Sequence, residues 1–250
     1  MEEENVIYGK NSVMEALISG NREINKILIS KNLHNDVKLN KIKELAQEKG
    51  VIYQFVAKEK FQPYAQFNHQ GIIAYISPIQ YMDIDDFIAQ NHQNSSLVIL
   101  DGIEDPHNLG SIIRTCVCAG VSGIVIPARR NVLINSLVEK VSAGATNHIP
   151  IIKVNSPVNA VQKLKNSNWW IIAADACAED NYYNINYCDM NFAIIMGAEH
   201  AGISKSLLKL SDFIVKIPML KDFNSLNVSN AFSAIIFEAV RQKLTNKKVK

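Results

Sequence analysis

The sequence lacks the features that mark a membrane, secreted or metal-binding protein. Its longest apolar runs, such as residues 192–196, are far shorter than the roughly 18 residues that a membrane helix needs. The first residues, Met1-Glu2-Glu3-Glu4, are acidic where a signal peptide is basic. The four cysteines include no Cys-x-x-Cys pair, and the histidines have no zinc-binding spacing. We therefore expect a cytoplasmic protein without a metal or a membrane contact.

Two common nucleotide-binding signatures are also missing. No Gly-x-Gly-x-x-Gly run opens the second half of the chain, which removes the main signal for a dinucleotide site. Residues 197–204 imitate a phosphate-binding loop, but Ile203 stands where that loop requires lysine, which disfavours a nucleoside triphosphatase. The net charge of +2 is too small to indicate nucleic acid. The acid-free basic tail from Arg241 to Lys250 fits either a phosphate contact or a solvated terminus.

The composition is that of a globular protein, and its patterns fall into two blocks. A length of 250 residues allows one large or two modest domains. Residues 1–77 predict a small α/β domain, with helices near 13–18 and 36–49 and strands near 26–29, 51–56 and 72–76. The polar stretch 78–96, which contains a short amphipathic piece, is predicted to be a linker.

The second block, residues 97–250, alternates strand and helix patterns. Short runs of Val, Ile and Leu between helices predict a parallel sheet that is buried on both faces. Cys116 and Cys118 fall in one helix pattern and are expected to be buried or half-buried thiols. The predicted strands are 97–100, 123–126, 149–154, 169–174, 192–196 and 213–217, and the predicted helices are 110–119, 134–142, 157–165, 204–210 and 229–244.

Three polar runs in this block lie where a predicted strand gives way to a loop or helix. Open parallel sheets place their ligands at that edge. The first run is 108–115, the second is 195–202 and the third is 217–229. Each run also has a simpler explanation. The first run fits a capped helix with a surface arginine, the second fits a solvated glutamate, and the third fits a helix cap. Capping needs one or two polar side chains, so the surplus within 225–230 favours recognition of a polar ligand.

In this order, the three runs resemble the three motifs of the SPOUT class of RNA methyltransferases, and most closely its ribose-methylating TrmH branch. Residues 8–13 and 69–74 resemble the ends of the L30e-like RNA-binding domain that precedes the catalytic domain in the 23S rRNA enzymes. The resemblance implies an α/β fold with an L30e-like substrate-binding domain over residues 1–77. It also implies a SPOUT domain over 97–250, whose C-terminal segment forms a trefoil knot, an exception to the rule that chains are unknotted.

The resemblance also implies an activity and a set of site residues. The activity is methyl transfer from S-adenosylmethionine to the ribose 2′-hydroxyl of a guanosine in 23S rRNA, with tRNA as the alternative substrate. The enzyme would be a homodimer with a site built from both chains, and the alternative outside the enzymes is a non-catalytic RNA-binding or ribosome-assembly protein. The implied catalytic residues are Arg114, Asn108, Glu199, Ser225 and Asn227, and the implied cofactor-binding residues are Gly197, Gly202, Ile217, Met219 and Leu226.

Two residues depart from the motifs of the family. Lys221 stands where the third motif usually has glycine, and His200 replaces a frequent glycine in the second. Glycine adopts backbone conformations that other residues rarely reach. We therefore expect an altered loop geometry with activity retained.

Overall fold

The structure is a computed structural model that describes residues 5–90, 92–221 and 226–247, and the chain forms two compact units. One unit combines the chain up to Gln80 with Ile134–His148, and the other combines Tyr81–Leu133 with the chain from Ile149 onward. The segment 134–148 lies within the block predicted to form the catalytic domain, yet it packs with the N-terminal residues. The first unit is therefore assembled from two separate pieces of sequence.

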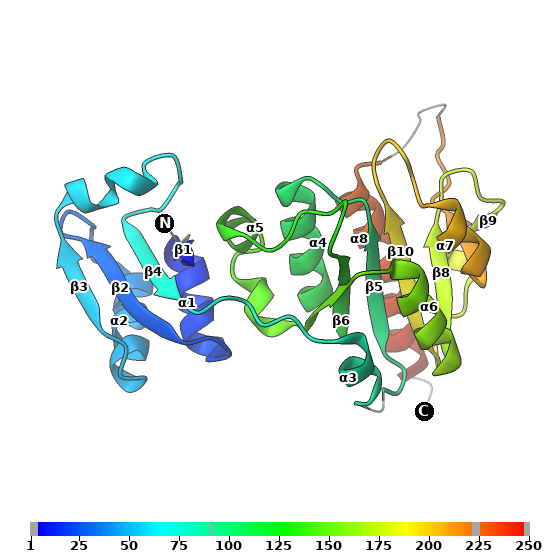
Figure 1. The fold of residues 1–250 in the computed structure, drawn as a ribbon, viewed down its shortest axis with the longest axis horizontal. Coiled ribbons are helices and arrows are strands. Elements are labelled where there is room, and N and C mark those ends of the chain that lie inside the picture. The colour runs from blue at the N-terminus through cyan, green and yellow to red at the C-terminus, as the bar shows by residue number, and fades with distance from the viewer. Residues whose placement is uncertain (1–4, 91, 222–225, 248–250) are drawn as a thin grey trace. The chain divides into compact units, whose positions relative to one another are not determined.

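The first unit is a four-stranded sheet covered on both faces. Strand β4 runs antiparallel to its neighbours β1 and β2, and β2 pairs in parallel with the edge strand β3. Apolar residues of α1 and α2 pack on one face, and Phe61 of η1 packs on the other. In chain order the elements are β1 (Val6–Tyr8), α1 (Lys10–Ser19), β2 (Ile24–Ser30), α2 (Val37–Glu48), β3 (Tyr53–Val56), η1 (Lys58–Tyr64), β4 (Ile72–Ile76), α5 (Ser136–Val141) and η2 (Ala145–His148) (Figure 1).

A buried ion pair holds α5 and η2 on this unit. The Arg22 guanidinium pairs with the Glu139 carboxylate, and the two side chains are only 7% and 4% exposed. Arg22 Nε and Nη2 also donate to the Ser77 carbonyl at 2.8 and 2.6 Å, and Thr146 Oγ1 donates to Glu139 Oε2 at 2.7 Å. Charges are buried at low cost only when they are paired and hydrogen-bonded. This cluster therefore fixes 134–148 to the unit with a specific geometry.

The second unit is a seven-stranded sheet in which every pair is parallel, in the order β7-β6-β5-β10-β8-β11-β9. The predicted α/β fold with a parallel sheet is confirmed. Its elements are α3 (Ile84–Ile88), β5 (Ser96–Asp101), α4 (Pro106–Ala119), β6 (Gly123–Pro127), β7 (Ile151–Val154), α6 (Pro157–Asn166), β8 (Trp169–Ala174), β9 (Asp180–Asn181), η3 (Tyr182–Asn184), β10 (Asn191–Gly197), α7 (Lys205–Leu210), β11 (Phe213–Lys216) and α8 (Val228–Lys247).

The late strand β10 lies between β5 and β8, which come earlier in the chain (Figure 1). The knot that the resemblance implies stays a prediction. The insertion places the end of β10 beside the end of β5, because Gly197 is in register with Asp101.

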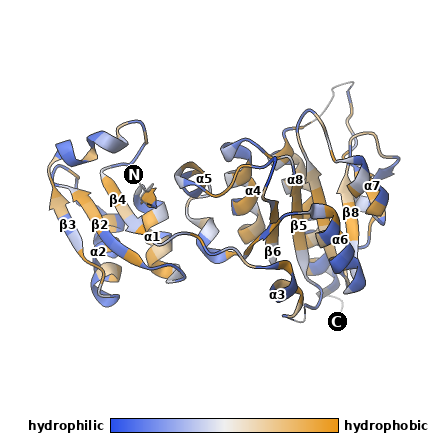
Figure 2. Ribbon diagram, in the orientation of Figure 1, coloured by the Kyte–Doolittle hydropathy of each residue, from blue (hydrophilic) through white to orange (hydrophobic). Residues whose placement is uncertain are grey.

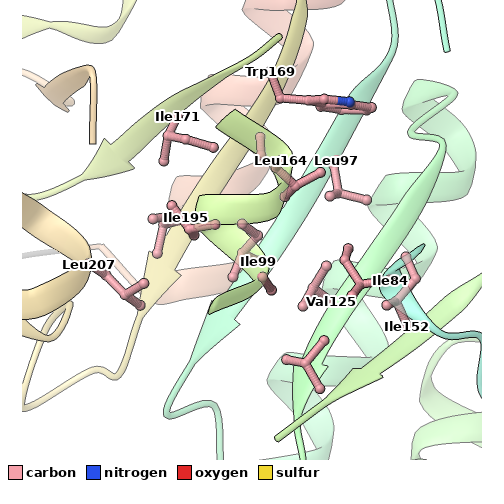
Figure 3. Packing of buried hydrophobic residues seen from close by; sticks show 14 of the residues in the cluster. Ile84, Leu97, Ile99, Val125, Ile152, Leu164, Trp169, Ile171, Ile195 and Leu207 are labelled. Atoms are coloured by element: carbon pink, nitrogen blue, oxygen red, sulfur yellow. The ribbon is translucent and has the colours of Figure 1, made fainter. Parts of the chain in front are cut away.

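Alternating apolar side chains of the strands build a core on each face of this sheet. Leu97 and Ile99 of β5 pack with residues of α3, α6 and α7, as Figure 3 shows. The intervening Val98 and Leu100 are also fully buried, because successive strand residues point to opposite faces. Helices α4 and α8 pack against each other and against β6 and β10. The apolar colouring of the strands in Figure 2 matches a sheet that is covered on both sides.

Several elements differ from the sequence-based expectations. Helix α4 begins at Pro106 instead of at Gly110, because the Asp105 carboxylate accepts the His107 N–H at 2.9 Å and proline suits the first helical position. In the stretch predicted to be a linker, α3 buries Phe87 in the core. Strands β1 and β9 were not predicted. The expectation for Cys118 was wrong, because this residue lies on the exposed side of α4.

We expect that Arg22→Ala will lower the free energy of unfolding of the first unit by about 3 kcal/mol, because it leaves the Glu139 charge buried without its partner. Urea unfolding followed by circular dichroism measures the loss, and hydrogen exchange at residues 134–148 locates it. The matched control is Arg241→Ala, which removes the Arg241–Glu238 pair of α8, whose arginine is 62% exposed, and should cost no more than about 1 kcal/mol. A similar small effect for both variants would contradict a stabilising role for the buried pair.

Candidate functional site

The three polar runs meet at the carboxyl edge of the parallel sheet in the second unit. The first run lies in α4 just after β5, the second runs from the end of β10 into the loop after it, and the third connects β11 with α8. Strands β5 and β10 are neighbours, and α4 packs against α8, so the starts of both helices lie beside the loop after β10. This edge is where open α/β sheets bind ligands.

One side chain from each run forms a closed hydrogen-bonded triangle. Asn108 Nδ2 donates to Glu199 Oε1 at 2.9 Å. Asn227 Nδ2 donates to the same Glu199 oxygen at 2.9 Å and to Asn108 Oδ1 at 2.8 Å. We call these three residues the Asn–Glu–Asn triangle. Glu199 Oε1 therefore receives two amide donors.

Asn108 and Asn227 owe their positions to the beginnings of helices. Asn108 lies in the first turn of α4 and is 7% exposed. Asn227 immediately precedes α8, and its Oδ1 accepts the N–H of Ser229 at 3.0 Å, the bond of a helix cap. The cap expected in the third run is thus present, and the same side chain uses its opposite end in the triangle. Capping and site formation are therefore both functions of Asn227.

The loop that carries Glu199 is short and tightly closed. Ala198 and Gly202 exchange backbone hydrogen bonds of 3.1 and 2.9 Å. The Ser204 N–H then donates to Asp101 Oδ2 at 2.8 Å, which fastens the loop to the end of β5. Gly197 has no room for a side chain, since a Cβ there would lie 2.3 Å from the Gly202 carbonyl carbon. The backbone of this loop therefore holds Glu199 in place.

Arg114 lies on α4 but outside the triangle. It is exposed and forms no ion pair with any residue that the structure describes. Six residues along an α-helix correspond to a rotation of roughly 240°, so Arg114 and the buried Asn108 project from different faces of α4. The arginine is thus available to a group outside the chain.

The residues expected to hold a cofactor are spread over the same edge. Ile217 is half-buried just after β11, whereas Met219 and Leu226 are 39% and 42% exposed. Gly202, with φ +65°, occupies a backbone conformation that suits glycine. Ser225, expected in the catalytic set, lies outside the described residues.

The two departures from the family motifs fit the backbone without strain. His200 and Lys221 are both exposed, and neither belongs to the residues with positive φ. A glycine is therefore not required for backbone conformation at either position. The expected change in loop geometry stays a prediction.

Sequence reasoning left two residues out of the site. Asp101 anchors the second loop, and its place at the end of a predicted strand was a usable signal. Ser229 contacts Asn227 with both its N–H and its hydroxyl, but its position in a polar run resembled an ordinary cap. Within the described part of the chain, no group of three or more His, Cys, Asp or Glu side chains could hold a metal ion.

Comparisons with known proteins match both units. Residues 95–237 match the SpoU rRNA methylase family, and residues 6–82 match the domain described as RNA 2′-O ribose methyltransferase substrate binding. A TrmH family tRNA/rRNA methyltransferase of Staphylococcus aureus is 40% identical over 244 residues, covering 96% of this chain and 97% of its own. A protein of the same description from Staphylococcus saprophyticus is also 40% identical, with the same coverage of both chains.

Solved structures share the fold. The SpoU methyltransferase AviRb from Streptomyces viridochromogenes, in complex with the cofactor AdoMet, has a TM-score of 0.82 at 21% identity and covers 96% of this chain and 90% of its own. The AdoMet-bound rRNA methyltransferase from Sinorhizobium meliloti has a TM-score of 0.79 at 23% identity, with coverage of 95% and 87%.

The chain belongs to the SpoU family of RNA methylases. It is an RNA 2′-O-ribose methyltransferase, and the family uses S-adenosylmethionine as its methyl donor. The substrate-binding domain of such enzymes comes first in the chain, before the methylase domain. None of the helices in the described residues is both long and apolar enough to span a membrane.

We expect that Gly197→Ala will displace the loop after β10, because backbone atoms of Gly202 and Ile203 occupy the space of the added Cβ. The cost should be about 1–3 kcal/mol of unfolding free energy, as for other overpacked sites, with faster hydrogen exchange at residues 198–203. Gly120→Ala is the comparison: it has φ +70° and open space, so it should cost only about 1 kcal/mol and leave that loop protected. Unchanged exchange in Gly197→Ala would contradict the steric argument.

Proposed function

We propose that this enzyme methylates the ribose 2′-hydroxyl of a guanosine in 23S rRNA, in the cytoplasm, as the methyltransferase RlmB does. The Asn–Glu–Asn triangle carries the proposal, because it joins one residue from each of the three motifs of the resemblance. The resemblance of residues 8–13 and 69–74 to the leading domain of the 23S rRNA enzymes favours ribosomal RNA over tRNA. The relatives are described as acting on tRNA or rRNA, so tRNA is the second candidate substrate.

The edge of the sheet offers groups that suit S-adenosylmethionine. An adenosine presents an apolar ring face together with polar edges and hydroxyls, and nucleoside sites combine apolar side chains with a few polar groups. Met219 and Leu226 present exposed apolar side chains in the loops at this edge, and Ile217 adds a half-buried one. We assign these residues, with the backbone at Gly197 and Gly202, to cofactor binding. When bound, the cofactor supplies an electrophilic methyl group.

Arg114 acts on the RNA as a fixed cation. A guanidinium stays protonated in proteins, which makes it a poor general base but a strong partner for phosphate. Arg114 is exposed and has no ion pair among the described residues, so a phosphate beside the target ribose can take that place. Holding the 2′-hydroxyl in line with the methyl group lowers the barrier by positioning.

The triangle presents an ordered carboxylate to the substrate. Glu199 Oε1 is occupied by the two amides, which leaves Oε2 as the oxygen that can accept a hydrogen bond from the substrate. Asn108 and Asn227 keep the carboxylate oriented, and Ser225 completes the proposed catalytic set. The enzyme acts as a homodimer in this proposal. A site built from two chains accounts for an arginine that projects away from the triangle of its own chain.

Methyl transfer from labelled S-adenosylmethionine to unmodified 23S rRNA and bulk tRNA, assayed in parallel, tests the substrate. We expect label on one 23S guanosine, with the methyl group on the ribose. Label confined to tRNA would support the proposed reaction but would show that tRNA is the substrate in place of 23S rRNA. Cofactor binding without transfer to naked RNA or to assembling ribosomal particles would instead favour a protein that only binds RNA.

Arg114→Ala should lower the rate of transfer at least about 100-fold, since the positioning of two reactants is lost. The affinity for S-adenosylmethionine should stay within about twofold, because Arg114 lies outside the proposed cofactor set. Single-turnover kinetics and calorimetric titration measure the two effects. Lys209→Ala, which removes another exposed cation, is the matched control and should retain activity. Near-normal turnover by Arg114→Ala would refute its catalytic role.

A further inference from the structure

The orientation of the Asn227 amide determines whether the Asn–Glu–Asn triangle can form. A carboxamide has a donor end and an acceptor end, and only the Nδ2 end can donate to both Glu199 Oε1 and Asn108 Oδ1. Rotating the amide by 180° would place its oxygen against two acceptor oxygens. A group on the opposite side of Asn227 must therefore favour the observed orientation.

Ser229 is that group. Its hydroxyl donates to Asn227 Oδ1 at 2.6 Å and its backbone N–H donates to the same oxygen at 3.0 Å. Both donors mark this end of the amide as the acceptor end, so Nδ2 must face Glu199 and Asn108. The side chain of Ser229 is well shielded, because the residue is only 6% exposed. Water cannot readily replace a hydroxyl removed from such a position.

The placement of Ser229 is independent of the loops that it orders. It lies in the first turn of the 20-residue helix α8, which packs against α4. One turn later, the Ser233 hydroxyl donates to the Ser229 carbonyl at 2.8 Å and contacts Thr115 Oγ1 of α4 at 3.2 Å. The first turn of α8 is therefore fixed by its packing against α4. Because Ser229 lies in this turn, its bonds fix the position of the Asn227 amide.

We propose that Ser229 is a positioning residue for methyl transfer, acting through the Asn227 amide on the Glu199 carboxylate. The proposal rests on the proposed function of the triangle. Because Ser229 is only 6% exposed and acts through Asn227, its loss should affect the rate of transfer more than the binding of substrate or cofactor. A lost hydrogen bond of this kind corresponds to a fall in kcat of about five- to tenfold.

The kinetic test compares Ser229→Ala with Ser229→Thr, which keeps a hydroxyl, and with Thr245→Ala, a matched control that removes a hydroxyl bond to the Arg241 carbonyl farther along α8. We expect Ser229→Ala to lower kcat about five- to tenfold with KM for S-adenosylmethionine within about twofold. Ser229→Thr should recover most of the rate, and Thr245→Ala should retain it. In an Asn227→Ala background, adding Ser229→Ala should cost nothing further, because the residue through which it acts is gone. An unchanged kcat, or an additive loss in the double variant, would overturn the proposal.

A second readout does not depend on activity. In protein labelled with ¹⁵N-asparagine, the side-chain amide signals of Asn227 are identified by their loss in Asn227→Ala. These signals should shift in Ser229→Ala and keep their positions in Thr245→Ala. If the wild-type enzyme methylates none of the RNAs supplied, the proposed function fails. The NMR comparison still shows in that case whether Ser229 positions the Asn227 amide. Unchanged Asn227 signals in Ser229→Ala would overturn that role.

Discussion

The insertion of β10 between β5 and β8 is the constraint on which the site depends. Parallel pairing on both sides places the end of β10 level with the end of β5, in the register that aligns Gly197 with Asp101. The loop after β10 then closes on itself and is tied to Asp101 through the Ser204 N–H. If β10 lay at an edge of the sheet, Glu199 would be remote from Asn108. Strand order, more than any individual bond, is therefore what creates the triangle.

The triangle also shows how helix ends serve two purposes at once. A helix start has unpaired N–H groups that need acceptors, and polar side chains collect there for that reason. Asn227 satisfies an N–H of α8 with its oxygen, which leaves its nitrogen free to bind the carboxylate of a neighbouring loop. The same interaction that stabilises α8 consequently orders the site. A substitution that preserves only the capping oxygen, such as aspartate, would place a second negative charge beside Glu199.

The sequence predicts the sheet well because short apolar runs that alternate with helix patterns leave few alternatives. Buried parallel strands appear as runs of Val, Ile and Leu, and the carboxyl ends of such strands meet at one edge of the sheet. The three polar runs each come after a strand, so their meeting at that edge could be predicted. The pattern could not reveal that residues 134–148 belong to the first unit. That placement depends on tertiary contacts such as those of Arg22 with Glu139 and of His148 with Glu15, between residues that look like ordinary surface charges. Phe87 was likewise hidden within a polar stretch, because a five-residue helix has too little periodicity to detect.

The sequence placed the start of α4 at Gly110, so it could not relate the direction of Arg114 to that of Asn108, and this relation has a mechanistic consequence. A catalytic cation inside the triangle would neutralise Glu199 and occupy the oxygen that we assign to the substrate. The structure instead separates the two charges on α4 and the β10 loop, with the arginine exposed and the carboxylate held by neutral amides. Amide donors orient a carboxylate without cancelling its charge. In the proposed function, Arg114 thus remains free to bind a phosphate and Glu199 remains free to accept a hydrogen bond from a hydroxyl. This arrangement suits a nucleotide, which carries the two groups on adjacent carbon atoms of its ribose.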